Sequence, residues 1–378
     1  MNLEFLYESL VALVTGDGWK MIVMWIIGGV LIYLAIKKDM EPTLLLPMGF
    51  GAILVNLPFS GAIGADGPLT TLYDAGIANE LFPLILFIGI GAMIDFGPLL
   101  ANPKLMIFGA AAQFGIFFTL CLASIFFPPA ENGLPLDAAS IAIIGAADGP
   151  TAIVVANALN SKYVGAIMVA AYSYMALVPV IQPPVIKALT TKKERMIRMP
   201  YEPKAVSQTT KILFPIVITV IAGLVAKESV ALVGFLMFGN LLRECGVLNS
   251  LSETAQKVLA NLVTIFLGIT VATQMQADKF LQIDTLVIIL LGLFAFIFDT
   301  AGGVLIAKLM NLFTKKKVNP MIGAAGISAF PMAGRIVHKM GLKEDPQNFL
   351  LMHSMGVNVS GQIASVIAGG LILGFFAG

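Results

Sequence analysis

Ten long apolar runs, separated by short polar stretches, constrain this chain more than any other feature of its sequence. A helix needs about 20 mostly apolar residues to cross a bilayer, so such runs predict about ten spanning helices. The composition agrees, because 58% of the residues are hydrophobic and 12% are charged, about half the charged share of a soluble domain. We therefore expect an all-α polytopic membrane protein. The runs lie near residues 19–36, 43–59, 81–100, 105–127, 163–186, 212–226, 229–242, 257–275, 284–312 and 347–376.

Charge and residue counts exclude several function classes. The chain has 23 Lys and Arg against 22 Asp and Glu, and the net charge of +1 gives no field that would attract nucleic acid. Its two cysteines and two histidines form no disulfide framework and no metal-binding motif. The first 18 residues have no basic segment and no cleavage pattern, so the run at 19–36 is expected to stay as a span.

Two further segments, 138–158 and 319–340, do not fit as simple spans. Basic clusters mark the cytoplasmic side of a membrane protein, and here they share one side only if each segment enters and leaves on the same face. We expect two re-entrant helical hairpins of opposite orientation, the first entering from outside and the second from inside, with the N-terminus outside. The helix breakers inside them are Gly149, Pro150, Gly326 and Pro331. The basic clusters are Lys37, Lys38, Lys187, Lys192, Lys193, Arg195, Arg198, Lys204, Lys211, Lys315, Lys316 and Lys317.

The two halves of the chain resemble each other at an offset of about 180 residues. Phe-Ile-Gly-Ile-Gly-Ala from Phe87 matches Phe-Leu-Gly-Ile-Thr-Val from Phe266. Gly-Ala-Ala-Asp-Gly-Pro from Gly145 matches Gly-Ala-Ala-Gly-Ile-Ser from Gly323. Matched segments in opposite orientations predict an inverted repeat with broken helices, as in ion-coupled carriers. The expected parts are an N-terminal half with the first hairpin, a cytoplasmic basic loop and an inverted C-terminal half with the second hairpin, at residues 1–186, 187–211 and 212–378.

Asp148, in the first hairpin, is the first candidate for chemistry. A carboxylate at the centre of a bilayer costs at least about 2.5–3.5 kcal/mol, so it needs a partner or a function. The adjacent glycine allows close approach of the backbone, and Pro150 frees a carbonyl group that suits a cation. The alternative is an aspartate at a loop tip on the membrane surface, capping a helix that begins at Pro150.

The second hairpin offers neutral oxygens and a guanidinium group. Asn319 and Ser328 carry the oxygen ligands that a hard, weakly held cation prefers. Arg335 is the only arginine after Arg243, and a guanidinium can clamp a carboxylate with two parallel hydrogen bonds. Its alternative role is an anchor at the cytoplasmic end of the hairpin.

A polar stretch interrupts the last apolar run. Asn358 lies between two glycines five residues apart, where an unwound helix would expose backbone oxygens. Ser360 and Gln362 follow it, and polar side chains of this kind commonly join helices in a membrane.

Three further polar residues lie in or beside apolar runs. Tyr174 can donate a hydrogen bond or a proton, or it can pack as an ordinary aromatic. Asp95 and Asp299 are expected at the membrane interface, close to the ends of their spans.

Together these motifs resemble the beta subunit of the sodium-ion-translocating, biotin-dependent decarboxylases, which act on oxaloacetate, methylmalonyl-CoA, glutaconyl-CoA or malonate. The resemblance covers nearly the whole chain. It rests on Gly-Ala-Ala-Asp-Gly-Pro-Thr around Asp148, Asn-Pro-x-x-Gly from Asn319, Ser-x-x-Pro-x-x-x-Arg from Ser328 to Arg335, and Gly-x-Asn-Val-x-Gly around Asn358.

The resemblance implies a subunit that decarboxylates carboxybiotin on a partner carrier protein and exports Na⁺ with consumption of a proton. Arg335 would face the carboxybiotin, and Asp148 or Tyr174 would exchange protons. The implied sodium path comprises Asp148, Asn319, Ser328, Asn358, Ser360 and Tyr174. The implied partners are a carboxyltransferase alpha subunit, a biotin carrier protein, a small membrane gamma or delta subunit and further copies of the chain, in a bacterial cell membrane. The compact length slightly favours an acyl-CoA system over oxaloacetate.

Two other function classes stay open on the residues alone. A secondary carrier, such as a sodium–proton antiporter or a sodium–carboxylate symporter, would share the expected architecture. A non-catalytic membrane anchor would leave the polar hairpins without a role. The chain has no Ala-Met-Lys-Met biotin-attachment motif, so a decarboxylase would need another chain to carry the biotin.

Overall fold

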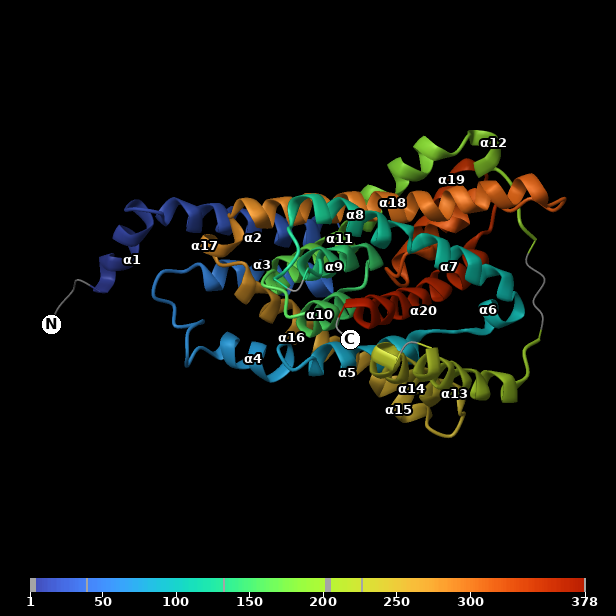
Figure 1. Cartoon of the computed structure of the whole chain (residues 1–378), viewed down its shortest axis with the longest axis horizontal. Helices are drawn as coiled ribbons and strands as arrows, with labels where there is room; N and C mark the ends of the chain where they lie inside the picture. The colour runs from blue at the N-terminus through green and yellow to red at the C-terminus, as the bar shows by residue number, and fades with distance from the viewer. Residues whose placement is uncertain (1–4, 39, 132, 201–204, 226, 377–378) are drawn as a thin grey trace.

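The computed structural model describes residues 5–38, 40–131, 133–200, 205–225 and 227–376, so Lys204 of the basic stretch lies outside the described residues. In the described part of the chain the regular structure is helical throughout. The helices form one bundle, and α1 (Phe5–Val14) projects at one end (Figure 1). The expectation of an all-α membrane protein is confirmed.

Among the described residues, six helical stretches are long and apolar enough to cross a membrane, or seven if α4 (Pro68–Gly76) and α5 (Leu81–Met93), which are bent by 66° relative to each other, form one span. The structure therefore supports fewer spans than the ten expected from the apolar runs. Four of the six are single helices, namely α2 (Gly18–Lys38), α11 (Val164–Leu189), α18 (Ile283–Phe313) and α20 (Leu351–Phe376). The fifth, Pro103–Phe126, comprises η1 (Pro103–Leu105), α7 (Met106–Ala112) and α8 (Phe114–Phe126). The sixth, Asn249–Gln274, comprises α15 (Asn249–Glu253), η4 (Thr254–Leu259), α16 (Ala260–Val271) and η5 (Ala272–Gln274).

The other four apolar runs form shorter helices. The run at 81–100 divides because the chain leaves the helix after Met93, and Asp95 Oδ1 then accepts a hydrogen bond of 2.8 Å from the Gly97 amide. Short polar turns of this kind end a helix by satisfying its free backbone groups. The shorter elements are α3 (Pro42–Val55), α5, α6 (Gly97–Ala101), α12 (Lys192–Arg195), α13 (Gln208–Val225), η3 (Lys227–Ser229), α14 (Val230–Glu244) and α17 (Ala277–Phe280).

Both segments expected to be hairpins fold as helices with a break in the middle. The first broken segment (136–158) consists of α9 (Leu136–Ala142) and η2 (Ile143–Ala146), a break at Ala147 and Asp148, and α10 (Gly149–Ala158). Ala147 has a left-handed backbone with a φ of 54°, which turns the chain between the two halves. The second broken segment (319–344) consists of η6 (Pro320–Gly326), an irregular stretch at 327–331, and α19 (Met332–Glu344).

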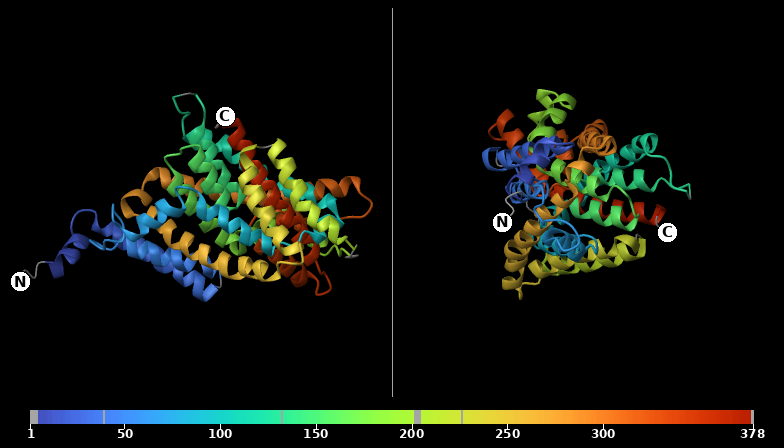
Figure 2. Two further views of the ribbon diagram at one scale, coloured as in Figure 1. Left: turned by 90° about the horizontal axis from the view of Figure 1, so that it is seen from below. Right: turned by 90° about the vertical axis from the view of Figure 1, so that its left-hand side faces the viewer.

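Glycines let the second broken segment pack closely against the two long helices α18 and α20. An ideal Cβ at Gly303 of α18 would lie 2.0 Å from the carbonyl oxygen of Gly323, and one at Gly361 of α20 would lie 2.1 Å from that of Gly326. No side chain fits at either position without displacing backbone. In Figure 1, α20 runs through the middle of the bundle, while the α13–α14 pair packs against α5 along one side (Figure 2).

The structure corrects one expected position. Asp95 follows the end of α5 with its side chain 46% exposed, as expected for an interfacial residue. Asp299, by contrast, is fully buried near the middle of α18. The expectation that Asp299 lies at the interface was wrong because the run at 284–312 folds as one continuous helix, Ile283–Phe313, in which Asp299 lies near the middle and not near an end.

Candidate functional site

One turn of α20, from Asn358 to Gln362, contacts both broken segments. The Gln362 side chain interacts with the carboxylate of Asp148 in the first segment. The Nδ2 of Asn358 donates to the carbonyl oxygens of Ala325 (3.1 Å) and Ile327 (2.7 Å) in the second segment. Residues four apart lie on the same face of a helix, so the two breaks meet α20 at nearly the same level.

Asp148 is enclosed by protein. It is 3% exposed and precedes α10, and the Thr151 hydroxyl donates a hydrogen bond of 2.7 Å to its Oδ2. The alternative of an exposed loop tip is therefore wrong. A buried carboxylate needs several hydrogen bonds or a cation, and Thr151 and Gln362 supply part of that need.

Tyr172, rather than Tyr174, lies beside Asp148. An ideal Cβ at Gly149 would lie 2.4 Å from the Tyr172 ring, so the ring occupies the space next to the residue that follows Asp148. Tyr172 is 1% exposed, and its hydroxyl has no hydrogen-bond partner among the described residues. Tyr174 lies two residues further along α11, which turns it by about 200°, and its hydroxyl donates to the carbonyl oxygen of Ile289 on α18.

Neutral oxygens gather where the second broken segment crosses α20 and α11. Ser328 Oγ donates to the carbonyl oxygen of Gly361 (3.0 Å), and Gln182 Nε2 donates to that of Ala324 (2.7 Å). The amide oxygens of Gln182 and Asn358 are buried and have no hydrogen-bond partner among the described residues. Acceptors left in this state cost free energy unless a donor or a cation binds them.

Ser360 faces away from this crossing. Its Oγ lies 2.6 Å from the carbonyl oxygen of Val357 in the preceding turn and 3.2 Å from that of Leu105 at the end of η1. The residue therefore joins α20 to the beginning of the α7–α8 stretch.

Asn319 connects the second broken segment to the basic stretch that precedes α13. Its Nδ2 donates to the carbonyl oxygens of Arg195 (2.8 Å) and Ile197 (2.9 Å). Its Oδ1 accepts from the Met321 amide (3.1 Å) as the N-cap of η6. All of these contacts are with backbone groups, and they hold the start of η6 in place.

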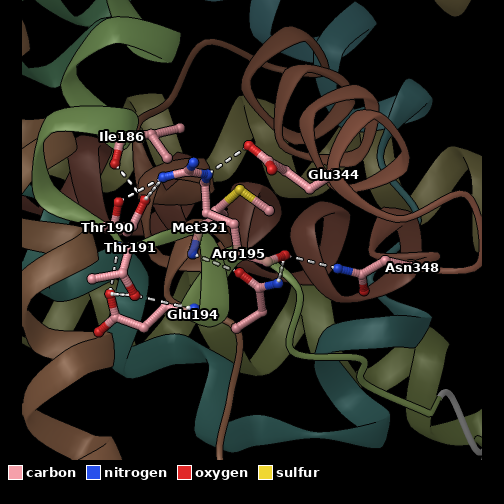
Figure 3. A network of polar contacts seen from close by, with 9 residues as sticks. Ile186, Thr190, Thr191, Glu194, Arg195, Met321, Glu344 and Asn348 are labelled. Carbon is pink, nitrogen blue, oxygen red and sulfur yellow. Dashed lines mark hydrogen bonds and ion pairs between the residues drawn. The ribbon is translucent and has the colours of Figure 1, made fainter.

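We call residues 190–198, Asn319 and residues 344–348 the clasp, and Figure 3 shows the part of it around Arg195. Arg195 is its centre, with Nε 2.7 Å from Glu344 Oε1 and Nη1 donating to the Thr190 carbonyl oxygen (2.6 Å). The Asn348 Nδ2 donates to the Arg195 carbonyl oxygen (3.0 Å).

A second ion pair closes the clasp on its outer side. The Arg198 guanidinium contacts both carboxylate oxygens of Asp345. The hydrogen bond from Arg198 lowers the pKa of Asp345 below its ordinary value, because it favours the charged form of the carboxyl group.

A cavity of about 730 Å³ opens beside α19 between α11 and the α2–α3 connection. Arg335 is exposed in this cavity and forms no ion pair with another described residue. The lining is strongly basic, with five Lys or Arg side chains and two Glu side chains. The basic residues are Lys38, Lys187, Arg335, Lys339 and Lys343, and the acidic residues are Glu41 and Glu344.

Sequence reasoning missed three residues of this arrangement, namely Thr151, Tyr172 and Gln182. Thr151 was one turn from Asp148 at the start of a predicted helix, which is a usable signal. Helical periodicity places Tyr172 and Tyr174 on different faces of one helix, but it does not show which of the two faces lies toward Asp148. Nothing local marks Gln182, because its partner Ala324 is 142 residues away.

Comparison with known proteins identifies the family. Residues 20–376 match the family model of the Na⁺-transporting oxaloacetate decarboxylase beta subunit. The chain is 46% identical to the oxaloacetate decarboxylase beta chain of Klebsiella pneumoniae, over 97% of this chain and 98% of that one. It is 49% identical to the methylmalonyl-CoA decarboxylase subunit beta of Veillonella parvula (97% and 95% covered) and 47% identical to that of Propionigenium modestum (94% of each).

The match extends over both broken segments and over the turn of α20 that joins them. Six helices of spanning length in the described part of the chain, together with the family match, make the chain a multi-pass protein of the bacterial inner membrane. It belongs to the beta-subunit family of the Na⁺-transporting decarboxylases and is the membrane subunit of a sodium-pumping decarboxylase.

Proposed function

We propose that this subunit decarboxylates carboxybiotin carried by a partner protein and uses the reaction to export Na⁺ through the crossing of the two broken segments on α20. The observation that carries the proposal is the convergence of a buried carboxylate and unpartnered buried oxygens on that crossing. Asp148 reaches Gln362 from one segment, and Asn358 holds the other segment one helical turn away.

The sodium ligands we assign are Asp148, Ser328 and Asn358, with Gln182 as a further oxygen donor. Among the described residues no three acidic, histidine or cysteine side chains come together, so the charge of a bound Na⁺ would be balanced by Asp148 alone. The other ligands would be neutral oxygens, which suits a cation that must also leave. Asn319 and Ser360 have backbone partners, and we assign to them the positioning of η6 and α20.

The coupling we propose is an exchange at Asp148. A protonated Asp148 that binds Na⁺ releases its proton, and carboxybiotin that takes up this proton breaks its N–CO₂ bond to give biotin and CO₂. Moving one charge across 100 mV costs about 2.3 kcal/mol, which the decarboxylation must supply. Tyr172, whose hydroxyl lies unpartnered beside Asp148, is the nearer of the two tyrosines to accept or pass that proton.

The basic cavity beside α19 is the site we assign to the carboxybiotin. A carboxybiotin bears a negative charge on a planar carboxylate, which the unpaired guanidinium of Arg335 can bind with two hydrogen bonds. The lysines around it would attract an acidic carrier protein. Because the chain lacks a biotin-attachment motif, the proposed reaction needs a partner chain that carries the biotin, and we propose a carboxyltransferase as a further partner.

We also propose that both broken segments are re-entrant hairpins of an inverted repeat. Each is shorter than a span on either side of its break, and each packs against α18 and α20 rather than continuing across the bundle. Irregular backbone at membrane depth is tolerated where protein covers it, and residues 141–153 and 320–329 are buried.

Length supports an acyl-CoA substrate for the complex. The alignments with the two methylmalonyl-CoA decarboxylase subunits run over 366 and 382 residues, close to the 378 of this chain, whereas that with the Klebsiella oxaloacetate decarboxylase chain runs over 428. Assembly with either set of partner chains, followed by measurement of decarboxylation of each acid, would decide between them.

The proposal is tested by carboxybiotin decay and ²²Na⁺ uptake in proteoliposomes that contain the subunit with its partner chains. We expect Na⁺ to accelerate the decay, and Asp148→Asn to abolish both activities while the protein stays folded. Tyr172→Phe and Tyr174→Phe form a matched pair, and the first should slow Na⁺-dependent decay more. Na⁺ uptake that proceeds without carboxybiotin would instead indicate a secondary carrier.

A further inference from the structure

The first helix presents an apolar face that the proposed reaction does not use. Four large side chains of α1 are at least half exposed and occupy positions i, i+3, i+4 and i+7, namely Tyr7, Leu10, Val11 and Val14. This spacing places them on one side of the helix, and we call them the apolar stripe. The other side packs against the start of α2 and is only partly exposed, at Ser9, Ala12 and Leu13. An exposed apolar face of this kind marks a contact with a membrane or with another protein.

A tight bend joins α1 to α2. Gly16 has a left-handed backbone with a φ of 57°, and an ideal Cβ at Gly18 would lie 2.1 Å from the carbonyl oxygen of Ala12. A side chain at position 18 would displace backbone, so glycine at this position lets the end of α1 contact the first residue of α2. Figure 1 shows α1 turning away from the direction of α2 at this end of the molecule.

The length of α2 places α1 at the surface of the bilayer. At a rise of about 1.5 Å per residue, the 21 residues of α2 extend about 31 Å, which matches the hydrocarbon core of about 30 Å. The helix α2 therefore spans the core without any contribution from α1. Because the bend is tight, α1 lies where α2 leaves the core, which is the region of the lipid headgroups.

A loop places a second apolar group at the same end of the molecule. Phe59, in the loop after α3, is 78% exposed and has a left-handed backbone with a φ of 57°. It lines a cavity of about 330 Å³ together with Asp17 and Lys20, which flank the start of α2. Trp19, between those two residues, is also exposed. Aromatic side chains concentrate at the interface between membrane and water, so Phe59 and Trp19 indicate the same level as α1.

Lipid fits this face better than a protein partner does. Exposed apolar side chains continue past the bend at Trp19, Ile22 and Ile26 of α2, a spanning helix of which little is buried in the protein. The apolar stripe thus extends, along the chain, a surface that lipid covers. A stable protein interface uses about 20–30 residues on each side, far more than the stripe supplies with Phe59 and Trp19.

We propose that α1 is an interfacial helix, which lies in the surface of the bilayer with the apolar stripe toward the acyl chains of the lipids. Phe59 and Trp19 insert beside it and extend the same contact. Glu8 is exposed beside the stripe and stays in the water-facing layer. The contact holds the first residue of α2 at the level of the headgroups, and its partner is the lipid of that leaflet.

Fluorescence quenching from the lipid and from water tests the proposal. The free cysteines Cys121 and Cys245 are replaced by serine. Leu10→Cys, Phe59→Cys or Glu8→Cys is then introduced singly and labelled with a fluorophore, and the complete complex is assembled in proteoliposomes. We expect lipids with a nitroxide near the headgroup to quench the probes at positions 10 and 59 more than aqueous iodide does. The probe at position 8 is the matched control, which iodide should quench more.

Three outcomes would overturn the proposal. Equal quenching by iodide at positions 8 and 10 would place the apolar stripe in water. Protection of position 10 from both quenchers would show that another protein chain covers the stripe. Quenching that is strongest from a nitroxide at the far end of the acyl chain would place α1 inside the hydrocarbon core rather than at its surface.

Discussion

Removing the side chain of Asn319 tests whether the clasp holds the second broken segment in place. Asn319→Ala deletes three hydrogen bonds, to the carbonyl oxygens of Arg195 and Ile197 and from the amide of Met321. Each buried hydrogen bond contributes about 0.5–1.5 kcal/mol, so together they stabilise the closed clasp by about 1.5–4.5 kcal/mol. A loss of about 1.4 kcal/mol is a tenfold change in an equilibrium, so local opening should rise at least about tenfold.

Hydrogen exchange of the peptide 319–326, followed by mass spectrometry, measures that opening. We expect exchange in Asn319→Ala to accelerate at least about tenfold, while the Na⁺ concentration for half-maximal activity changes little. Asn79→Ala is a matched control, because Asn79 makes two hydrogen bonds with neighbouring backbone at an exposed site. Exchange that stays at the parental rate, with a raised Na⁺ requirement, would refute the reasoning and make Asn319 a sodium ligand.

Two further predictions concern α20 and the clasp. Gly361→Ala puts a Cβ 2.1 Å from the Gly326 carbonyl oxygen, so it should lower both the midpoint of thermal unfolding and the rate of Na⁺-dependent decarboxylation. The control is Gly374→Ala, which should change neither, because nothing lies within 4 Å of the added Cβ. A Gly361→Ala protein with an unchanged midpoint and rate would contradict the close packing. Because the pKa of Asp345 is lowered, its contact with Arg198 stabilises the fold above the ordinary carboxyl pKa of about 3.9 and is lost as the pH falls through the lower folded value. The difference in thermal midpoint between the parent and Arg198→Ala should therefore be constant from about pH 7 to 5 and shrink below about pH 4; a difference that shrinks already between pH 7 and 5 would contradict this assignment.

Some site residues could be predicted from the sequence, because their own chemistry and their immediate neighbours in the chain were enough to mark them. Asp148 could be chosen because a carboxylate in an apolar run, beside Gly149 and Pro150, is too costly to place in a membrane unless it binds a proton or a cation. The breaks in the two segments were predicted from glycines and prolines, because proline lacks the backbone donor that a helix interior needs and glycine loses more conformational freedom in a helix than other residues. Arg335 stood out because it is alone in its part of the chain, and the structure leaves it unpaired in the described basic cavity.

The contacts of these residues depended on distant parts of the chain. Asn319 was expected to offer an oxygen to Na⁺, yet its amide group meets backbone 122 and 124 residues away. Asp299 was expected at the interface, but α18 continues past it and buries it against Gly115 and Gly145. Neither contact could be predicted from the neighbouring residues, because a side chain has the same sequence neighbours whichever helix packs against it in the fold.

The sequence by itself determined that this chain is a helical membrane protein with two broken segments and a small set of polar residues. These features can be read from neighbouring residues: the length of each apolar run, the helix breakers in it and the few charges it contains. They determine the fold class because a bilayer accepts only apolar segments of sufficient length whose backbone hydrogen bonds are satisfied. The tertiary structure alone decided which polar groups meet. It brought Tyr172 rather than Tyr174 to Asp148 and joined both breaks on one turn of α20, because close packing at Gly326 and Gly361 fixes how the helices cross.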